Sequence, residues 1–171
     1  MGIQTSVNFV QGFGVPGELY DNGTVRCEPF SLLSADPTTN IFGTAFTILS
    51  EGVAQSGNPL GTAVFAGIMA NPKAVKSVGI IGNPLAPTLT VPNNVIVEML
   101  NMGCVIVQLP AAAAIGDLVL YDNITGALET VAPGTALPVG KSSAYAVVDR
   151  YTVSGAGLAV IRLTTTPEIP V

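Results

Sequence analysis

The chain has 171 residues, of which 49% are hydrophobic and only 10% are charged, and it has no histidine and a net charge of −5. This composition is too apolar for a disordered chain, and the lack of histidine excludes Ser-His-Asp and Cys-His catalytic groups and histidine-based zinc sites. The acidic balance, with scattered basic residues, argues against nucleic acid and anionic membrane as partners. The length suits one domain, and the mean hydropathy of +0.57 indicates that part of its surface is buried against other chains.

Residues 1–17 are predicted to form an extended N-terminal arm. Apolar and polar side chains alternate from Ile3 to Phe9, and the glycine-rich stretch 12–17 separates this segment from the body. The arm either adds to a neighbouring subunit or forms the first strand of its own barrel. If it serves assembly, the expected partner contacts are Ile3, Val7, Phe9, Val10 and Phe13.

Two short motifs in this region are interpreted as chance matches. Residues 12–17 fit the dinucleotide pattern G-x-G-x-x-G, but the turn and strand expected at 18–25 provide no helix to bind a pyrophosphate. Residues 1–6 fit the myristoylation pattern, but no lysine or arginine before Arg26 supplies a second membrane signal. We therefore expect no cofactor and no membrane partner.

Residues 18–163 are predicted to form the core, a single β-barrel or β-sandwich domain of all-β class. The stretch 29–40 is expected to be a loop, with one possible helical turn at 31–35. Short runs rich in β-branched and aromatic residues, bounded by Gly, Pro, Asn or Ser, predict strands at 42–49, 63–70, 88–91 and 95–100. Prolines predict an extended surface tail at 164–171.

The chain is expected to be organised around a β-meander at 103–131, with strands at 104–109, 118–121 and 127–131. The alanines after Pro110 are too few to nucleate a helix, so a single turn or a packed extended connection is expected there. A hairpin of 144–153 and 158–163 closes the domain. The predicted buried strand residues of the meander are Val105, Val107, Leu118 and Leu120.

No residue is assigned a catalytic, cofactor-binding or metal-binding role. Asp117 and Asp122 could face each other across a hairpin as an acid/base or calcium pair, but turn formation is the commoner role of such residues. The two cysteines, Cys27 and Cys104, have no metal-ligand spacing. No secretory signal opens the sequence, so we expect synthesis in a reducing cytoplasm and two buried thiols.

An ordered set of segments resembles a known family. The segments are Phe65–Lys73, Pro84–Pro92, Leu109–Asp117 with Thr125–Leu128, and Gly155–Leu163. In this order they are similar to the structural cement, or head decoration, proteins of tailed bacteriophages, and the likeness covers most of residues 42–163. The resemblance implies a β-barrel or sandwich core and no enzymatic activity. It also implies multimers, often trimers, on the outer capsid surface where major capsid protein subunits meet.

Three functions are therefore considered, in decreasing order of support. The first is a capsid-stabilising decoration protein of the virion, with the major capsid protein and its own copies as partners and with no small-molecule substrate. The second is another virion or surface structural domain, such as a tail, fibre or adhesin component. The third is a β-barrel enzyme that uses Asp117 and Asp122 or Glu98.

Overall fold

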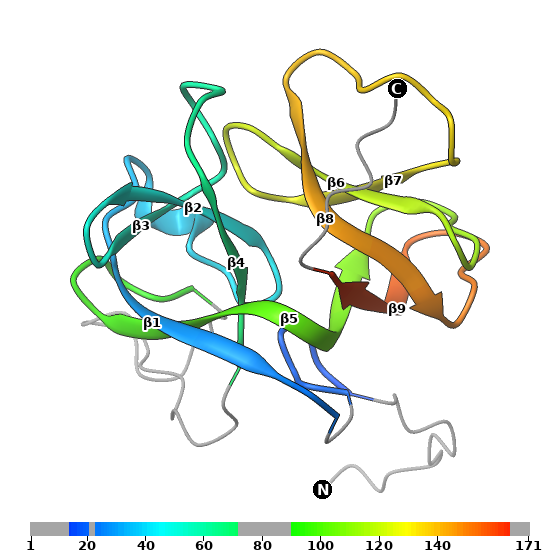
Figure 1. Cartoon of the computed structure of the whole chain (residues 1–171), viewed down its shortest axis with the longest axis horizontal. Coiled ribbons are helices and arrows are strands. Elements are labelled where there is room, and N and C mark those ends of the chain that lie inside the picture. The colour runs from blue at the N-terminus through cyan, green and yellow to red at the C-terminus, as the bar shows by residue number, and fades with distance from the viewer. Residues whose placement is uncertain (1–13, 21–22, 72–89, 165–171) are drawn as a thin grey trace, which may run out of the picture.

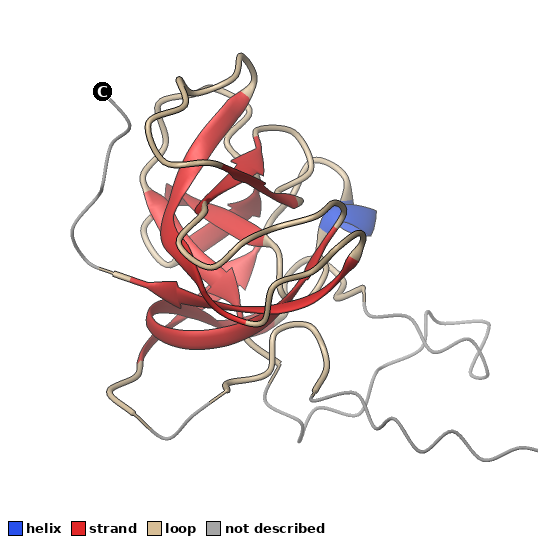
Figure 2. Cartoon of the chain, turned by 90° about the vertical axis from the view of Figure 1, so that its right-hand side faces the viewer, coloured by secondary structure: helices blue, strands red, loops and turns tan. Residues whose placement is uncertain are grey.

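The computed structural model describes residues 14–20, 23–71 and 90–164. These residues form an all-β body with one short 3₁₀ helix, η1 (Pro37–Thr39), visible in blue in Figure 2. The strands are β1 (Arg26–Leu32), β2 (Ala45–Ser50), β3 (Val53–Ser56), β4 (Phe65–Met69), β5 (Ile96–Leu109), β6 (Leu118–Asp122), β7 (Leu128–Val131), β8 (Lys141–Arg150) and β9 (Gly157–Leu163).

Strand β5 connects the two halves of the body, as Figure 1 shows. Its first half pairs with β1 and β4 and closes a five-stranded barrel in the order β1-β3-β2-β4-β5. Its second half pairs with β9 and begins a sheet in the order β5-β9-β8-β6-β7. The barrel confirms the predicted fold class.

The partners of β5 change at Gly103. Met102 is the last residue of β5 paired with β1, and Gly103 is the first paired with β9. Gly103 has a φ of 126°, which side chains disfavour, and a Cβ there would lie 3.3 Å from the side chain of Val25. Glycine at this position allows one strand to belong to both the barrel and the sheet.

The hydrophobic core follows the same division but is continuous across it. One cluster fills the barrel around Phe46 and Met69. A larger cluster joins barrel residues such as Ile68 and Leu100 to sheet residues such as Val105. Phe65 of β4 also packs against the rings of two tyrosines of the sheet, Tyr121 and Tyr145, with centroid distances of 5.7 Å each. The two halves therefore share buried apolar surface as well as a strand.

Residues 14–20 lie along the free side of the second half of β5. The Gly17 N–H donates to the Ile106 carbonyl at 2.8 Å, the Ile106 N–H donates to the Glu18 carbonyl at 2.9 Å, and the Tyr20 N–H donates to the Cys104 carbonyl at 3.0 Å. The Tyr20 and Tyr151 hydroxyls are also bonded at 2.8 Å. The expected turn and strand after residue 17 therefore begins as a short edge segment of the sheet.

The meander was predicted incorrectly at its first connection. Strand β5 pairs with β9, and β9 and β8 lie between β5 and β6. The β6–β7 and β8–β9 hairpins are as predicted. The expected alanine-rich connection is extended, and Ala113 pairs with Val153. The partner of β5 comes from a distant segment, which local patterns do not specify.

The expected loop at 29–40 is wrong for residues 29–32 and correct from residue 33, and the possible helical turn at 31–35 is wrong. Residues up to Leu32 belong to β1, because pairing with β5 fixes them as a strand, and the helical turn lies at η1, after Asp36. The predicted strands at 95–100 and 104–109 are one strand, β5, and β3 was not predicted at all. Of the strand expected at 88–91, residues 88–89 lie outside the described residues, and Thr90 forms a bridge with Ile41.

Candidate functional site

Three loops come together at one end of the body and form what we call the loop platform, defined as residues 57–64, 122–126 and 132–140. The first loop connects β3 to β4 of the barrel, and the other two connect β6 to β7 and β7 to β8 of the sheet. Figure 1 shows all three at the upper end of the molecule. The platform therefore spans both halves of the protein.

Asn123 holds the three loops together. Its carbonyl accepts the Asn58 N–H at 2.8 Å, and its N–H donates to the Gly140 carbonyl at 3.0 Å. Its side-chain oxygen accepts the Ser142 hydroxyl at 2.7 Å. The barrel loop approaches Asn123 closely at Gly57. A Cβ at this position would lie 2.6 Å from the Asn123 carbonyl oxygen. These backbone bonds fix the positions of the three loops relative to one another at Asn123.

Asp122 stabilises the middle loop electrostatically. One carboxylate oxygen accepts the N–H groups of Ile124 and Thr125 and the Thr125 hydroxyl, and the other accepts Lys141 Nζ at 3.1 Å. Partial burial raises the pKa of Asp122, but the bonds from Thr125, Lys141 and Ile124 outweigh it and lower the pKa to about 2. Lys141 also donates to Glu129 at 2.6 Å, which raises the lysine pKa. The carboxylate is thus a structural group that stays charged.

Two of the three platform loops expose apolar side chains and contain no charged residue. Residues 57–64 and 132–140 contain no charged residue, and every residue from 132 to 140 is exposed. The exposed large apolar side chains are Leu60, Val64, Ile124, Leu137 and Val139, with exposed fractions from 45% to 102%. Held in place by the Asn123 bonds, they form a surface suited to binding another protein.

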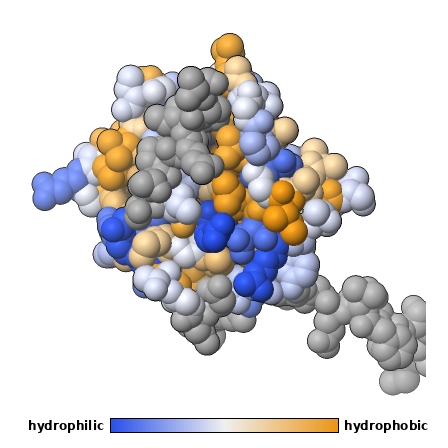
Figure 3. All heavy atoms as spheres, turned by 45° about the vertical axis from the view of Figure 1, so that its right-hand side comes forward, coloured by the Kyte–Doolittle hydropathy of each residue, from blue (hydrophilic) through white to orange (hydrophobic). Residues whose placement is uncertain are grey.

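The side face of the molecule is different. Figure 3, in which the β6–β9 side comes forward, shows hydrophobic patches interrupted by hydrophilic residues. Five ion pairs are formed by the described residues, and two of them join Asp149 to Arg150 and Arg162 on this sheet. The loops of the platform were overlooked in the sequence, although uncharged Gly/Pro-rich loops with isolated Leu and Val are a signal that could have identified them.

The acidic residues considered for catalysis are not brought together. Asp117 and Asp122 flank the two ends of β6, so they lie about 16 Å apart rather than face to face. Asp117 accepts the Ala114 N–H at 2.8 Å and shapes the turn before β6. Glu98 lies on the first half of β5, in the barrel. Among the described residues, no group of three acidic, cysteine or histidine side chains could hold a metal ion.

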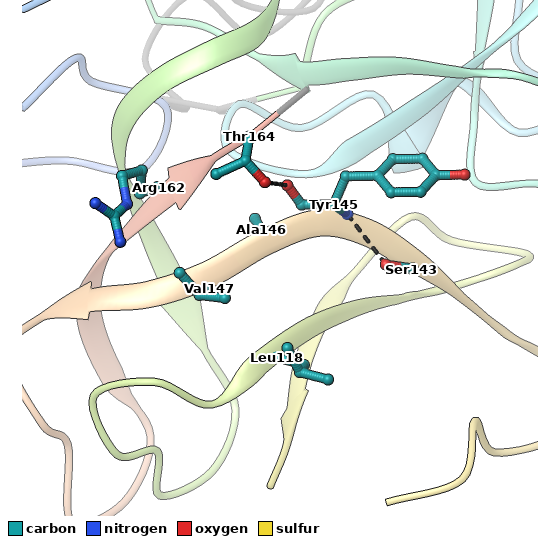
Figure 4. Close-up of a pocket in the computed structure, with 7 residues that line it drawn as sticks. All are labelled: Leu118, Ser143, Tyr145, Ala146, Val147, Arg162 and Thr164. Carbon is teal, nitrogen blue, oxygen red and sulfur yellow. Dashed lines mark hydrogen bonds between the residues drawn. The ribbon is translucent and has the colours of Figure 1, made fainter. Parts of the chain in front are cut away.

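The described residues form hollows, two of which are candidate binding sites. The first, of about 140 Å³, lies where β8 bulges at Tyr145, whose φ is 51° and whose carbonyl accepts the Thr164 N–H at 3.0 Å. Figure 4 shows the Tyr145 ring and the Arg162 guanidinium pointing in opposite directions, so they do not converge on a ligand. The second, of about 300 Å³, is an apolar groove beside the barrel, which we call the barrel groove; it is lined by Pro29, Phe42, Ala70, Val91, Val95, Ile96, Val97 and Glu98.

The remaining predictions concern the arm, the thiols and the membrane. The predicted partner contacts Ile3, Val7, Phe9, Val10 and Phe13 lie outside the described residues. Cys104 is buried as expected, Cys27 is half-buried, and they form no disulfide. In the described ranges, no helix is long and apolar enough to cross a membrane.

A closed barrel joined to a sheet, with exposed apolar side chains on the loops at one end, is typical of a structural protein that binds other proteins. The family model described as Structural cement protein (E217 gp24/Pam3 gp6) matches residues 3–164, and the chain belongs to this phage cement family. It is therefore a structural protein that decorates and stabilises a phage capsid.

Solved structures with the same fold include a phage capsid. A chain of the structure titled "The capsid of Myoviridae Phage XM1" is 18% identical, with a TM-score of 0.63, and the match covers 96% of this chain and 99% of that chain. No curated protein matches the sequence. The membership of the family confirms the predicted resemblance, and the solved structure confirms the fold.

Proposed function

We propose that the protein binds the outer surface of the capsid as a homo-oligomer, with a trimer as the expected form, and bridges adjacent major capsid protein subunits through the loop platform. The observation that carries this proposal is the platform itself, five exposed apolar side chains on loops fixed by Asn123. We further propose that its partners are proteins alone, without nucleic acid, membrane or small-molecule substrate, and that it has no catalytic activity. The scattered positions of Asp117, Asp122 and Glu98 support the last point.

Bridging would stabilise the shell by a mechanical route. A protein attached to two subunits adds buried surface at a joint that internal pressure pulls apart, and an oligomer that holds several subunits gains affinity from effective concentration. The virion location follows from the family, whereas the outer face and the joint are the proposal. The N-terminal arm, with Ile3, Val7, Phe9, Val10 and Phe13, is proposed to supply contacts between copies.

The test is binding of the full chain to capsids assembled without it. Leu60→Asp and Val139→Asp place a charge in the platform, and each should weaken binding about tenfold or more, because the carboxylate must be desolvated at the interface. The matched control is Ile115→Asp, since Ile115 is 61% exposed but lies outside the platform. If Leu60→Asp and Val139→Asp bind capsids as tightly as the control Ile115→Asp and the wild type, the platform does not contact the shell.

A further inference from the structure

The barrel loop of the platform, residues 57–64, projects from the body as a narrow turn with an apolar tip. Figure 1 shows this loop rising above β4 at the upper end of the molecule. Residues 59–62 are all exposed, and Leu60 among them is 77% exposed, whereas Gly57 and Asn58 at the base are buried. We call residues 59–62 the leucine knob.

Asn58 fixes the leucine knob to the body. Its side-chain oxygen accepts the Ala63 N–H at 3.1 Å, and its side-chain nitrogen donates to the Ala63 carbonyl at 3.5 Å. Its carbonyl accepts the Gly61 N–H at 2.9 Å, and its own N–H donates to the Asn123 carbonyl at 2.8 Å. One buried residue therefore closes the turn and joins it to the sheet, so that little order has to be gained when a partner binds.

The loop at 132–140 is held differently. It exposes a second leucine, Leu137, at 45%, and in the described part of the chain no side chain forms a hydrogen bond with residues 132–139. A loop with fewer bonds loses more conformational entropy on binding, which reduces the affinity that each of its side chains adds. Of the two leucines, Leu60 is therefore the better placed to provide affinity.

The shape of the leucine knob indicates the shape of the partner surface. Against a flat surface, only the end of a projecting side chain would be buried, whereas a concave surface would enclose it. The loop has no charged residue that could pair with a charge in such a cavity, and an unpaired buried charge is unfavourable. A cavity that receives Leu60 is therefore expected to have an apolar lining.

We propose that Leu60 is the anchor of capsid attachment and enters an apolar pocket on a major capsid protein subunit, with Asn58 as its positioning residue. The inference rests on the proposed function, and it names the kind of surface that the loop platform recognises.

The first test measures binding of the full chain to capsids assembled without it. Leu60→Ala should weaken binding about tenfold or more, because the buried leucine surface is lost. The matched control Leu137→Ala, the same truncation on the loop at 132–140, should weaken it about threefold or less. Equal effects of the two truncations would overturn the assignment of Leu60 as the anchor.

A larger side chain tests whether the partner surface is a pocket. Leu60→Trp should weaken binding about tenfold, because a pocket that fits leucine excludes the indole ring, while Leu60→Met should stay within about threefold of the wild type. Leu60 is exposed, so both variants should keep the circular dichroism spectrum of the wild type. A Leu60→Trp variant that binds as tightly as the wild type would show a flat contact and overturn the pocket.

A double-mutant cycle tests the positioning role of Asn58. Asn58→Ala should weaken binding about fivefold, and Leu60→Ala should have a smaller effect in that background than alone, because the loosened turn no longer presents the leucine. The matched control is Asn93→Ala. Asn93 bonds to the Ser34 N–H at 3.0 Å and to the Ser34 carbonyl at 2.9 Å, outside the platform, so Leu60→Ala should keep its full effect there.

An effect of Leu60→Ala that is unchanged by Asn58→Ala would contradict the positioning role. If Asn58→Ala does not fold, Pro59→Gly replaces it in the cycle, because Pro59 is exposed and glycine loosens the turn without removing a buried group.

Salt dependence tests the apolar lining. Between about 0.1 and 0.5 M NaCl, the affinity of the wild type should change about threefold or less, since the loop that carries Leu60 has no charge to be screened. A decrease of about tenfold or more would indicate a charged partner surface and overturn the apolar pocket.

Leu60→Asp and Val139→Asp in the same assay separate this inference from the proposed function. If both weaken binding while Leu60→Ala acts like Leu137→Ala, the leucine pocket is wrong and the platform still binds the capsid. If both bind as tightly as the wild type, the proposed function itself is wrong.

Discussion

The strands of the barrel and the strands of the sheet pair with partners at different distances along the sequence. The sheet consists largely of strands joined by hairpins, β6–β7 and β8–β9, whose partners are close in sequence. The barrel closes through pairs that are more distant in sequence, β1 with β5 and the parallel pair β1–β3. The loop platform takes one loop from the barrel and two from the sheet, so its shape depends on both halves remaining together.

The largest expected effect tests whether the two halves unfold together. Phe46 is fully buried in the barrel, and Phe46→Ala should destabilise the protein by about 3 to 5 kcal/mol. All four tyrosines, Tyr20, Tyr121, Tyr145 and Tyr151, lie outside the barrel strands. Because the halves share β5 and one core cluster, tyrosine fluorescence and circular dichroism should shift to the same lower midpoint in urea.

The matched change on the sheet side is Val107→Ala, which should cost about 1 to 3 kcal/mol in the same single transition. Val107 is buried, as are the other predicted core residues, Val105, Leu118 and Leu120. A tyrosine signal that keeps its wild-type midpoint in Phe46→Ala would mean that the barrel and the sheet unfold independently.

The next effect tests the closure of the barrel. Gly67 has a φ of 144°, and a Cβ there would collide with the backbone of Leu100 where β4 meets β5. Gly67→Ala should therefore cost about 2 to 4 kcal/mol, measured by urea unfolding. Gly116 also has a positive φ, 93°, but a Cβ there meets no atom within 4 Å, so Gly116→Ala should cost only about 1 kcal/mol of backbone strain. If the two variants lose equal unfolding free energy, backbone strain alone accounts for the loss at Gly67, and the close approach to Leu100 adds nothing.

A smaller effect should appear at low pH, in the sheet half of the platform. The pKa of Asp122 is lowered from 3.8 to about 2 by folding, so its stabilising contribution is complete above about pH 4 and is lost as the pH falls through 2. The contribution should be about 1 to 2 kcal/mol, since the side chain is partly exposed. Asp122→Asn should flatten the decrease in unfolding free energy between pH 4 and 2. An unchanged slope would place the acid sensitivity at other carboxylates.

The smallest effect concerns the bonds that join the loops. Ser142→Ala removes the hydroxyl that donates to Asn123 at 2.7 Å and should cost about 1 kcal/mol. Hydrogen exchange measured by mass spectrometry should become faster in residues 122–126 and 137–141 and stay unchanged in β2. Uniformly faster exchange would instead indicate a global loss of stability.

The difference between the halves also explains what the sequence could predict. The β6–β7 hairpin has a local signal, since Asp122, Thr125 and Gly126 make their own turn. The β8–β9 hairpin and the buried residues Val105 and Val107 were also predicted from the sequence. The β1–β5 closure was not, because pairing of residues about 70 positions apart decided that Pro29 to Leu32 is strand and not loop.

The candidate site was less predictable than the fold. The platform depends on Asn58, Asn123 and Gly140 meeting from three separate loops, and no local pattern specifies that meeting. The order of the segments predicted the family, which is confirmed, whereas the burial of apolar surface against other chains, inferred from the composition, stays a prediction. Neither could show which end of the body carries the exposed side chains.

The central claim is that the loop platform attaches this cement protein to the joint between major capsid protein subunits. Cryo-electron microscopy of capsids saturated with the full chain tests it directly, because the map gives the orientation, the copy number and the contact surface together. We expect density on the outer surface, with residues 57–64, 122–126 and 132–140 against two adjacent capsid subunits. A map in which these loops face the solvent, or in which each copy contacts a single subunit, would contradict the claim.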